Sequence, residues 1–143
     1  MSETSNKSIV QSIFAALAEG DRKPFADAMA DDFSWTIAGH GPWARTWCGK
    51  AAVRSGLMAP LFAQFADTYR NRATRIVCEG DTVVVECRGS VTTHAGPRYD
   101  NHYCYVIEMQ GGKMHALTEY MDTALAEAVL SHRHECTARI SHR

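Results

Sequence analysis

The sequence lacks several features that would place its 143 residues in a broad functional class. It has no apolar run near the roughly 20 residues that a membrane-spanning helix needs. The first residues, Met1 to Lys7, are polar, so we expect no secretory signal peptide. The net charge is −1, and there is no basic stripe apart from a short tail. Because nucleic-acid binding depends on clustered Lys and Arg, we expect neither a nucleic acid nor a membrane among the partners.

Paired, closely spaced cysteines are also missing. The five cysteines are scattered and odd in number, and none form a CxxC pair: Cys48, Cys78, Cys87, Cys104 and Cys136. Disulfide frameworks and structural zinc sites both need such pairs. We therefore expect reduced thiols, no metal site and a cytoplasmic protein. The sequence also has no glycine-rich phosphate loop and no nucleophile elbow.

What the sequence does contain is the composition of one globular domain, with 45% hydrophobic and 22% charged residues. We expect a single domain over 1–143, with its core at about 8–130 and a flexible tail at 131–143. Apolar residues at steps of three and four predict a first helix ending near Gly20, and Pro24 suits the first turn of a second. A third is predicted at 51–66, with Pro60 as a kink or break.

From Tyr69 onward the apolar residues recur at every second position, as in a β-strand. A clean alternation predicts a half-buried strand at 82–92, and further strands are predicted at 33–37, 99–109 and 113–122. Hairpin turns are predicted at residues 79–81 and 110–112. Helices followed by antiparallel strands indicate an α+β fold, in which N-terminal helices pack on one face of a curved, mostly antiparallel sheet. A curved sheet closed by helices leaves a cavity on its concave side, which is a natural site for a small molecule.

The predicted strand at 99–109 has one unusual face. Tyr99, Asn101, Tyr103 and Tyr105 point the same way, where a purely structural strand would favour Val, Ile or Leu. Tyrosine and asparagine combine area with polar tips, which suits a pocket lining. The alternative is that these groups satisfy buried backbone or face a dimer partner.

Glu119 is the candidate catalytic residue. It shares a face of the last strand with His115, Leu117 and Met121 by simple alternation. An inward carboxylate there would be desolvated, which raises its pKa toward neutrality, as a general acid–base requires. The alternative is an outward Glu119, solvated or paired with an arginine. His40, in a loop rich in Gly, Pro and Trp, could reach the mouth of the pocket.

The chain resembles the SnoaL-like proteins of the nuclear-transport-factor-2-like superfamily, which includes the ketosteroid isomerases. The resemblance covers about residues 8–130. It rests on the opening helices, on Ala30-Asp31-Asp32-Phe33, and on the closing motifs at 99–106, 112–114 and 119–122. It implies a cone-shaped fold, a homodimer and a deep apolar pocket, with the carboxylate at the Glu119 position pointing inward.

The characterised branches of the superfamily match this sequence only in part. Ketosteroid isomerases use an Asp base, a Tyr and a protonated Asp. This chain has Ile37 at the position of the base and Ile13 at that of the Tyr, and the position of the protonated Asp falls at or near Tyr105. Of the five catalytic groups of limonene-epoxide hydrolases, only one has a counterpart in this chain, which is Glu119. Polyketide cyclases of the SnoaL type rely on one pocket carboxylate, and Glu119 is compatible with that role.

Two main hypotheses follow. The first is a cofactor-independent enzyme, with no metal, that uses Glu119 as general acid–base on an apolar, aromatic or polycyclic molecule in an isomerisation, cyclisation or addition of water. The second is a non-catalytic protein that binds a small apolar ligand; a purely structural dimer module is a third. The residues predicted to line the site are Trp35, Ile37, His40, Trp47, Phe65, Val85, Cys87, Asn101, Tyr103, Tyr105 and Leu117.

Overall fold

A computed structural model describes residues 2–131, and the predicted tail at 131–143 lies outside this range except for Ser131. The first helix, α1, spans Glu3–Ala18. The Ser2 hydroxyl caps it by accepting a hydrogen bond from the Ser5 N–H at 3.2 Å. Its buried face carries Val10, Ile13, Phe14 and Leu17, as the apolar spacing predicts. The chain then turns at Gly20, whose φ of 85° lies in the left-handed region that glycine tolerates.

The sheet has six strands in the order β2-β1-β6-β5-β4-β3. Its pairs are antiparallel except for the parallel pair β1–β6. Both predicted hairpin turns are confirmed: β3 joins β4 through Gly80–Asp81, and β5 joins β6 through Gly111–Gly112. The strands are β1 (Met29–Ile37), β2 (Arg45–Cys48), β3 (Arg70–Glu79), β4 (Thr82–Ser90), β5 (His102–Gln110) and β6 (Lys113–Met121).

The remaining helices are short. Helix α2 spans Lys23–Asp27, with Pro24 in its first turn as predicted. The predicted third helix is a continuous helical run with a wide central turn: α3 (Lys50–Ala52), the π-helix η1 (Val53–Met58) and α4 (Ala59–Phe62). Pro60 lies at the start of α4, directly after the π-helical turn, so the predicted break is a change of helix type within the run. Helix α5 (Thr123–Val129) follows β6 and is capped by the Asp122 carboxylate.

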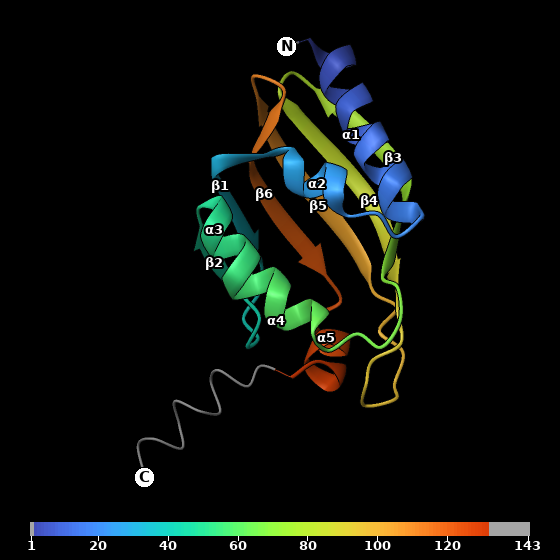
Figure 1. Cartoon of the computed structure of the whole chain (residues 1–143). Coiled ribbons are helices and arrows are strands. Elements are labelled where there is room, and N and C mark those ends of the chain that lie inside the picture. Colours follow the sequence, from blue (N-terminus) through green and yellow to red (C-terminus); the bar gives the residue numbers. More distant parts are fainter. Residues whose placement is uncertain (1, 132–143) are drawn as a thin grey trace.

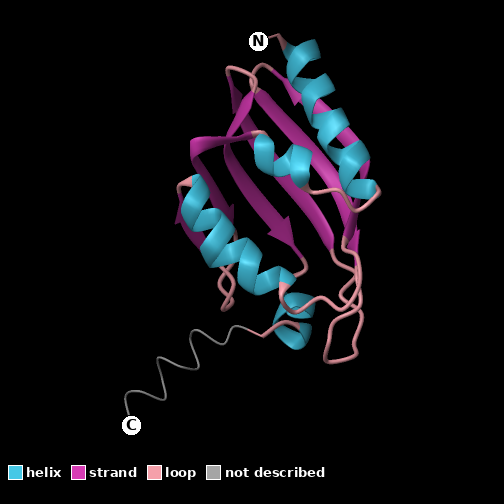
Figure 2. Ribbon diagram, viewed as in Figure 1, coloured by secondary structure: helices cyan, strands magenta, loops and turns pink. Residues whose placement is uncertain are grey.

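The helices form one layer over one face of the curled sheet, so the expected α+β architecture is confirmed. Helix α1 crosses β3 and β4, while the run from α3 to α4 lies beside β1 and β2 (Figure 1). Helix α2 sits between these two, and α5 closes the lower end of the layer (Figure 2). None of the helices within residues 2–131 is long and apolar enough to cross a membrane.

Simple alternation fails in β6, where the prediction that His115 shares the face of Glu119 is wrong. The pairing of β5 with β6 shifts after Glu108↔Ala116, because Met109 pairs with Met114 and His115 is skipped. This bulge turns Met114 into the core, while His115 faces outward and approaches Asp32 at 3.3 Å. The residues beyond the bulge keep the predicted alternation, so Leu117 and Glu119 remain buried.

Candidate functional site

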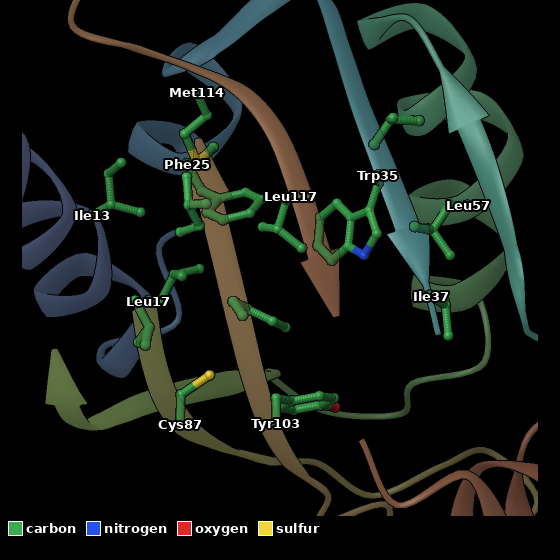
Figure 3. Close-up of a cluster of buried hydrophobic side chains, with 14 of the residues drawn as sticks. Ile13, Leu17, Phe25, Trp35, Ile37, Leu57, Cys87, Tyr103, Met114 and Leu117 are labelled. Atoms are coloured by element: carbon green, nitrogen blue, oxygen red, sulfur yellow. The ribbon is translucent and has the colours of Figure 1, made fainter. Parts of the chain in front are cut away.

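An apolar cavity lies between the sheet and the helices, with a volume of about 60 Å³. Its wall is contributed by the helical layer, by β1, β3, β5 and β6, and by the loops between them. Figure 3 shows side chains from these layers meeting, with Trp35 of β1 beside Leu57 of η1 and Leu117 of β6. The lining residues are Leu17, Arg22, Phe25, Trp35, Ile37, Trp43, Leu57, Met58, Leu61, Phe62, Tyr69, Asn71, Tyr99, Tyr103, Tyr105, Glu119, Met121 and Leu130.

Glu119 is the carboxylate in this wall. It is 6% exposed, and its Oε1 accepts a hydrogen bond from the Trp35 indole N–H at 2.9 Å. The two side chains come together because Ile37, two residues after Trp35, pairs with Glu119 across β1 and β6. Burial raises the pKa of Glu119 from 4.5 to about 7, and the Trp35 hydrogen bond opposes part of that rise. A carboxyl group with this pKa can both accept and release a proton near neutral pH.

Tyrosine hydroxyls form a second polar group on the wall. The Tyr69 hydroxyl donates to the Tyr103 hydroxyl at 3.3 Å, and the Asn71 amide donates to the Tyr105 hydroxyl at 3.4 Å. Burial raises the pKa of Tyr69, Tyr103 and Tyr105 well above 10, so all three stay protonated near neutral pH. The Tyr69 hydroxyl gives its one proton to Tyr103, so the hydroxyls of Tyr103 and Tyr105 are the ones available as neutral hydrogen-bond donors to an oxygen of a ligand.

The structure brings part of the predicted site together. Trp35, Ile37, Tyr103, Tyr105 and Glu119 all line the cavity. Within this group Trp35 and Tyr105 also pack edge to face, with ring centroids 5.8 Å apart, so the two rings hold each other beside the carboxylate.

Several predicted lining residues lie off the cavity wall because other side chains cover them. Val85 and Leu117 are 0% and 1% exposed and belong to the packed core, as does Cys87. Phe65 stacks on Tyr69, with centroids 5.4 Å apart, and so lies behind the tyrosines.

Trp47, Asn101 and His40 also lie off the cavity wall. Trp47 is buried beside η1, next to Gly56. The Asn101 amide is used within the fold: it donates to the Tyr99 hydroxyl at 2.9 Å and accepts from the Asp122 N–H at 3.2 Å. His40 is exposed in the loop after β1.

The wall includes polar residues that the sequence did not single out: Arg22, Trp43, Tyr69 and Asn71. Tyr69 and Asn71 share the two-residue spacing of the inward face, which was the one signal for them. Within residues 2–131, the Trp43 indole nitrogen and the Asn71 amide oxygen are buried without a hydrogen-bond partner. Buried polar atoms are normally paired, so these two are candidates to bind a ligand.

A further question is whether the described residues include a possible metal site. Across residues 2–131, no cluster of three or more His, Cys, Asp or Glu side chains could hold one. The four cysteines in this part of the chain, Cys48, Cys78, Cys87 and Cys104, are free thiols.

Comparisons with known proteins agree with this architecture. The family model of the SnoaL-like domain matches residues 10–117. A comparison with the curated proteins gives no match.

Many solved structures share the fold. Bal32a, from a soil-derived mobile gene cassette, is 20% identical with a TM-score of 0.76, and the match covers 90% of this chain and 98% of that one. A proposed SnoaL-like polyketide cyclase from Jannaschia sp. CCS1 is 17% identical with a TM-score of 0.73, covering 91% and 94%. A proposed isomerase from Bacillus subtilis is 18% identical with a TM-score of 0.73, covering 90% and 95%.

Proposed function

Because the chain belongs to the SnoaL-like domain family, we propose that it is a small-molecule enzyme of the isomerase or cyclase type, with Glu119 as its general acid–base. The observation that carries this proposal is the Glu119 carboxyl group, buried on the wall of an apolar cavity with a pKa of about 7. The similar folds of a proposed polyketide cyclase and a proposed isomerase support the same reaction types.

The geometry supports chemistry at the carbon next to a carbonyl group. The Glu119 carboxylate would remove a proton from that carbon, and the electron pair of the C–H bond would move into an enolate. The neutral Tyr103 and Tyr105 hydroxyls would donate hydrogen bonds to the enolate oxygen. Trp35 acts as a positioning residue, since its N–H holds the carboxylate in place.

The proton can then return in two ways. In an isomerisation, the Glu119 carboxyl group gives it back at another carbon of the enolate. In a cyclisation, the enolate carbon attacks a second carbonyl of the same substrate, and Glu119 protonates the resulting alkoxide. Both routes balance without oxidation or reduction.

The size of the cavity sets a condition on the substrate. A cavity of about 60 Å³ is smaller than the engineered cavity of roughly 150 Å³ that admits benzene. An aromatic substrate must therefore displace part of the wall. Met58, Leu61 and Phe62 are the side chains to move, because they are partly exposed and lie on the helical run interrupted by the π turn.

The test is proton exchange on a probe rather than turnover of the unknown substrate. The probe is 2-tetralone, a bicyclic ketone whose α-protons exchange in D₂O and are followed by NMR. We expect the protein to accelerate exchange and Glu119→Gln to lower the rate at least about 100-fold, the usual contribution of a general base. Glu79→Gln, at an exposed glutamate of β3, is the matched control and should leave the rate unchanged.

A second pair of variants tests the role of Trp35. Trp35→Phe removes the indole N–H from Glu119, so the pKa read from the pH–rate profile should move upward. Trp47→Phe alters another buried tryptophan, away from the cavity, and should leave the profile in place. Normal exchange by Glu119→Gln would overturn the proposal.

A non-catalytic binding protein is the second candidate. The unpaired Trp43 nitrogen and Asn71 oxygen favour it, because they point to recognition rather than to proton transfer. It predicts that 2-tetralone binds without accelerated exchange and that Glu119→Gln keeps its affinity within about tenfold, or 1.4 kcal/mol.

A further inference from the structure

Arg22 is a cation in the wall of the mostly apolar cavity. Its guanidinium carbon lies 3.8 Å from the centroid of the Phe62 ring, which is also part of the wall. Arg22 is exposed at the turn before α2 and forms no ion pair among residues 2–131. The residue therefore marks where the cavity meets the surface.

An outer groove borders the cavity at this point. The groove has a volume of about 500 Å³ and lies between α2 and the run of η1 and α4. Arg22, Met58 and Phe62 line both the groove and the cavity. Because these three side chains border both spaces, we take them to be the mouth of the cavity.

The charge of the groove is positive. It contains Arg22 and Arg54, and within the described part of the chain neither is paired with a carboxylate. Its other charges cancel, because Lys23 and Asp27 form an ion pair at 2.6 Å. An anion at the mouth would thus meet uncompensated guanidinium groups, which suit carboxylate recognition.

The interior of the cavity disfavours an anionic group. A carboxylate moved into the cavity would lose its hydration, which costs several kcal/mol, and would approach the Glu119 carboxylate. An acidic ligand can therefore bind in one direction only, with its ring system inside and its charged group at the mouth.

We infer that the substrate is an amphiphilic acid, an apolar ring system bearing a carboxylate that Arg22 and Arg54 hold at the mouth. This inference rests on the proposed function, because it takes the same cavity as the reaction site. It orients the substrate so that the carbon far from the carboxylate reaches Glu119. Arg22 and Arg54 are then specificity-determining residues.

The experiment compares two ligands of the same shape, 2-naphthaleneacetate and 2-naphthaleneacetamide, in NMR or calorimetric titrations at pH 6. We expect the acid to bind at least about fivefold more tightly than the amide. In the double variant Arg22→Gln/Arg54→Gln the two affinities should become equal, with the amide unaffected. The variant Arg22→Lys/Arg54→Lys keeps the charges and should keep most of the preference.

Two controls separate this inference from its alternatives. Arg72→Gln/Arg88→Gln removes arginines that pair across β3 and β4 on the outer face of the sheet, and should leave the preference unchanged. Glu119→Gln should also leave it unchanged, so a failure of the catalytic proposal, read from exchange on the neutral 2-tetralone, remains distinct.

Three results would overturn the inference. They are equal affinities of the unmodified protein for acid and amide, a preference that survives the double Gln variant, and failure of both ligands to bind. The first two would leave the role of Glu119 intact.

Discussion

Glu119 holds its proton more tightly in the folded protein than in water, since burial raises its pKa from 4.5 to about 7. Between these two values the folded state binds more protons than the unfolded state, so the stability of the fold decreases as the pH rises. Above pH 7 the ionised, buried carboxylate lowers the free energy of unfolding by roughly 3 kcal/mol relative to acidic pH.

We therefore predict that Glu119→Gln stabilises the protein more at pH 8 than at pH 5. The neutral amide can still accept the Trp35 hydrogen bond, but it has no charge to desolvate. Urea unfolding of both proteins at the two pH values measures the effect. An identical difference between them at pH 5 and pH 8 would show that Glu119 is not perturbed by burial.

The two inward asparagines show what residue type alone cannot reveal. Asn101 was predicted to bind substrate, but its amide connects the start of β5 to the end of β6 through Tyr99 and Asp122. Asn71, a lining residue of the cavity, donates to Tyr105, and its buried carbonyl oxygen has no hydrogen-bond partner. Which of the two asparagines keeps an unpaired polar atom depends on contacts between strands that are distant in sequence.

At the scale of elements, Gly89 of β4 makes room for the tyrosines of the site. A Cβ atom at this position would lie 2.6 Å from the Tyr69 hydroxyl and 3.0 Å from Tyr103 Cε2. Such approaches require the rings to move, so the absence of a side chain at Gly89 permits the Tyr69–Tyr103 hydrogen bond.

We predict that Gly89→Ala destabilises the protein by about 1–3 kcal/mol, the typical cost of overpacking, and slows proton exchange on 2-tetralone. Because the closest contact is the hydroxyl group, Tyr69→Phe in the Gly89→Ala background should restore part of the lost stability in urea unfolding. Gly41→Ala is the control, since its Cβ would meet Glu127 Oε2 at an ordinary 3.5 Å. Additive effects of Gly89→Ala and Tyr69→Phe would contradict the assigned clash.

The elements themselves were largely predictable, because each carries its own periodicity. The inward face of β4, the tyrosine face of β5 and both hairpin turns follow from alternation and glycine placement. The bulge at His115 was not predictable, since it depends on the pairing of β6 with β5 rather than on either sequence. The same limit applies to Trp43 and Trp47, which lie four residues apart. Trp43 lines the cavity, whereas Trp47 lies against Gly56 of η1 and off the cavity wall.

At the scale of the whole molecule, the outer face of the sheet carries charge in bands. Strand pairing aligns Arg72, Arg88 and His102 in a basic row, and Glu79, Thr82 and Glu108 in an acidic row. Between them lie an apolar row of Val77, Val84 and Val106 and a mixed row that ends at Tyr120. Val77 and Tyr120 are each 51% exposed, which sets them apart from the other large apolar side chains of residues 2–131.

The basic row and the acidic row are complementary in charge. Two copies can pack with these sheet faces against each other, related by a twofold axis that runs parallel to the rows and between the apolar row and the mixed row. The basic row of each copy then lies over the acidic row of the other. The contact also covers Val77 and Tyr120. We therefore predict a homodimer through this face, the assembly implied by the resemblance to SnoaL-like proteins.

Sedimentation velocity tests the prediction. The unmodified protein should sediment as a dimer that weakens with added salt, because facing charged rows are screened. Val77→Asp places a charge in the apolar row and should weaken the dimer at least about tenfold, whereas Ala124→Asp, on an exposed position of α5, should not. Since Glu119 and the mouth at Arg22 lie on the opposite, helical side of the sheet, the monomeric variant should keep proton exchange on 2-tetralone. Loss of exchange together with the dimer would instead show that the second copy supports the cavity, and a monomeric unmodified protein would contradict the predicted interface.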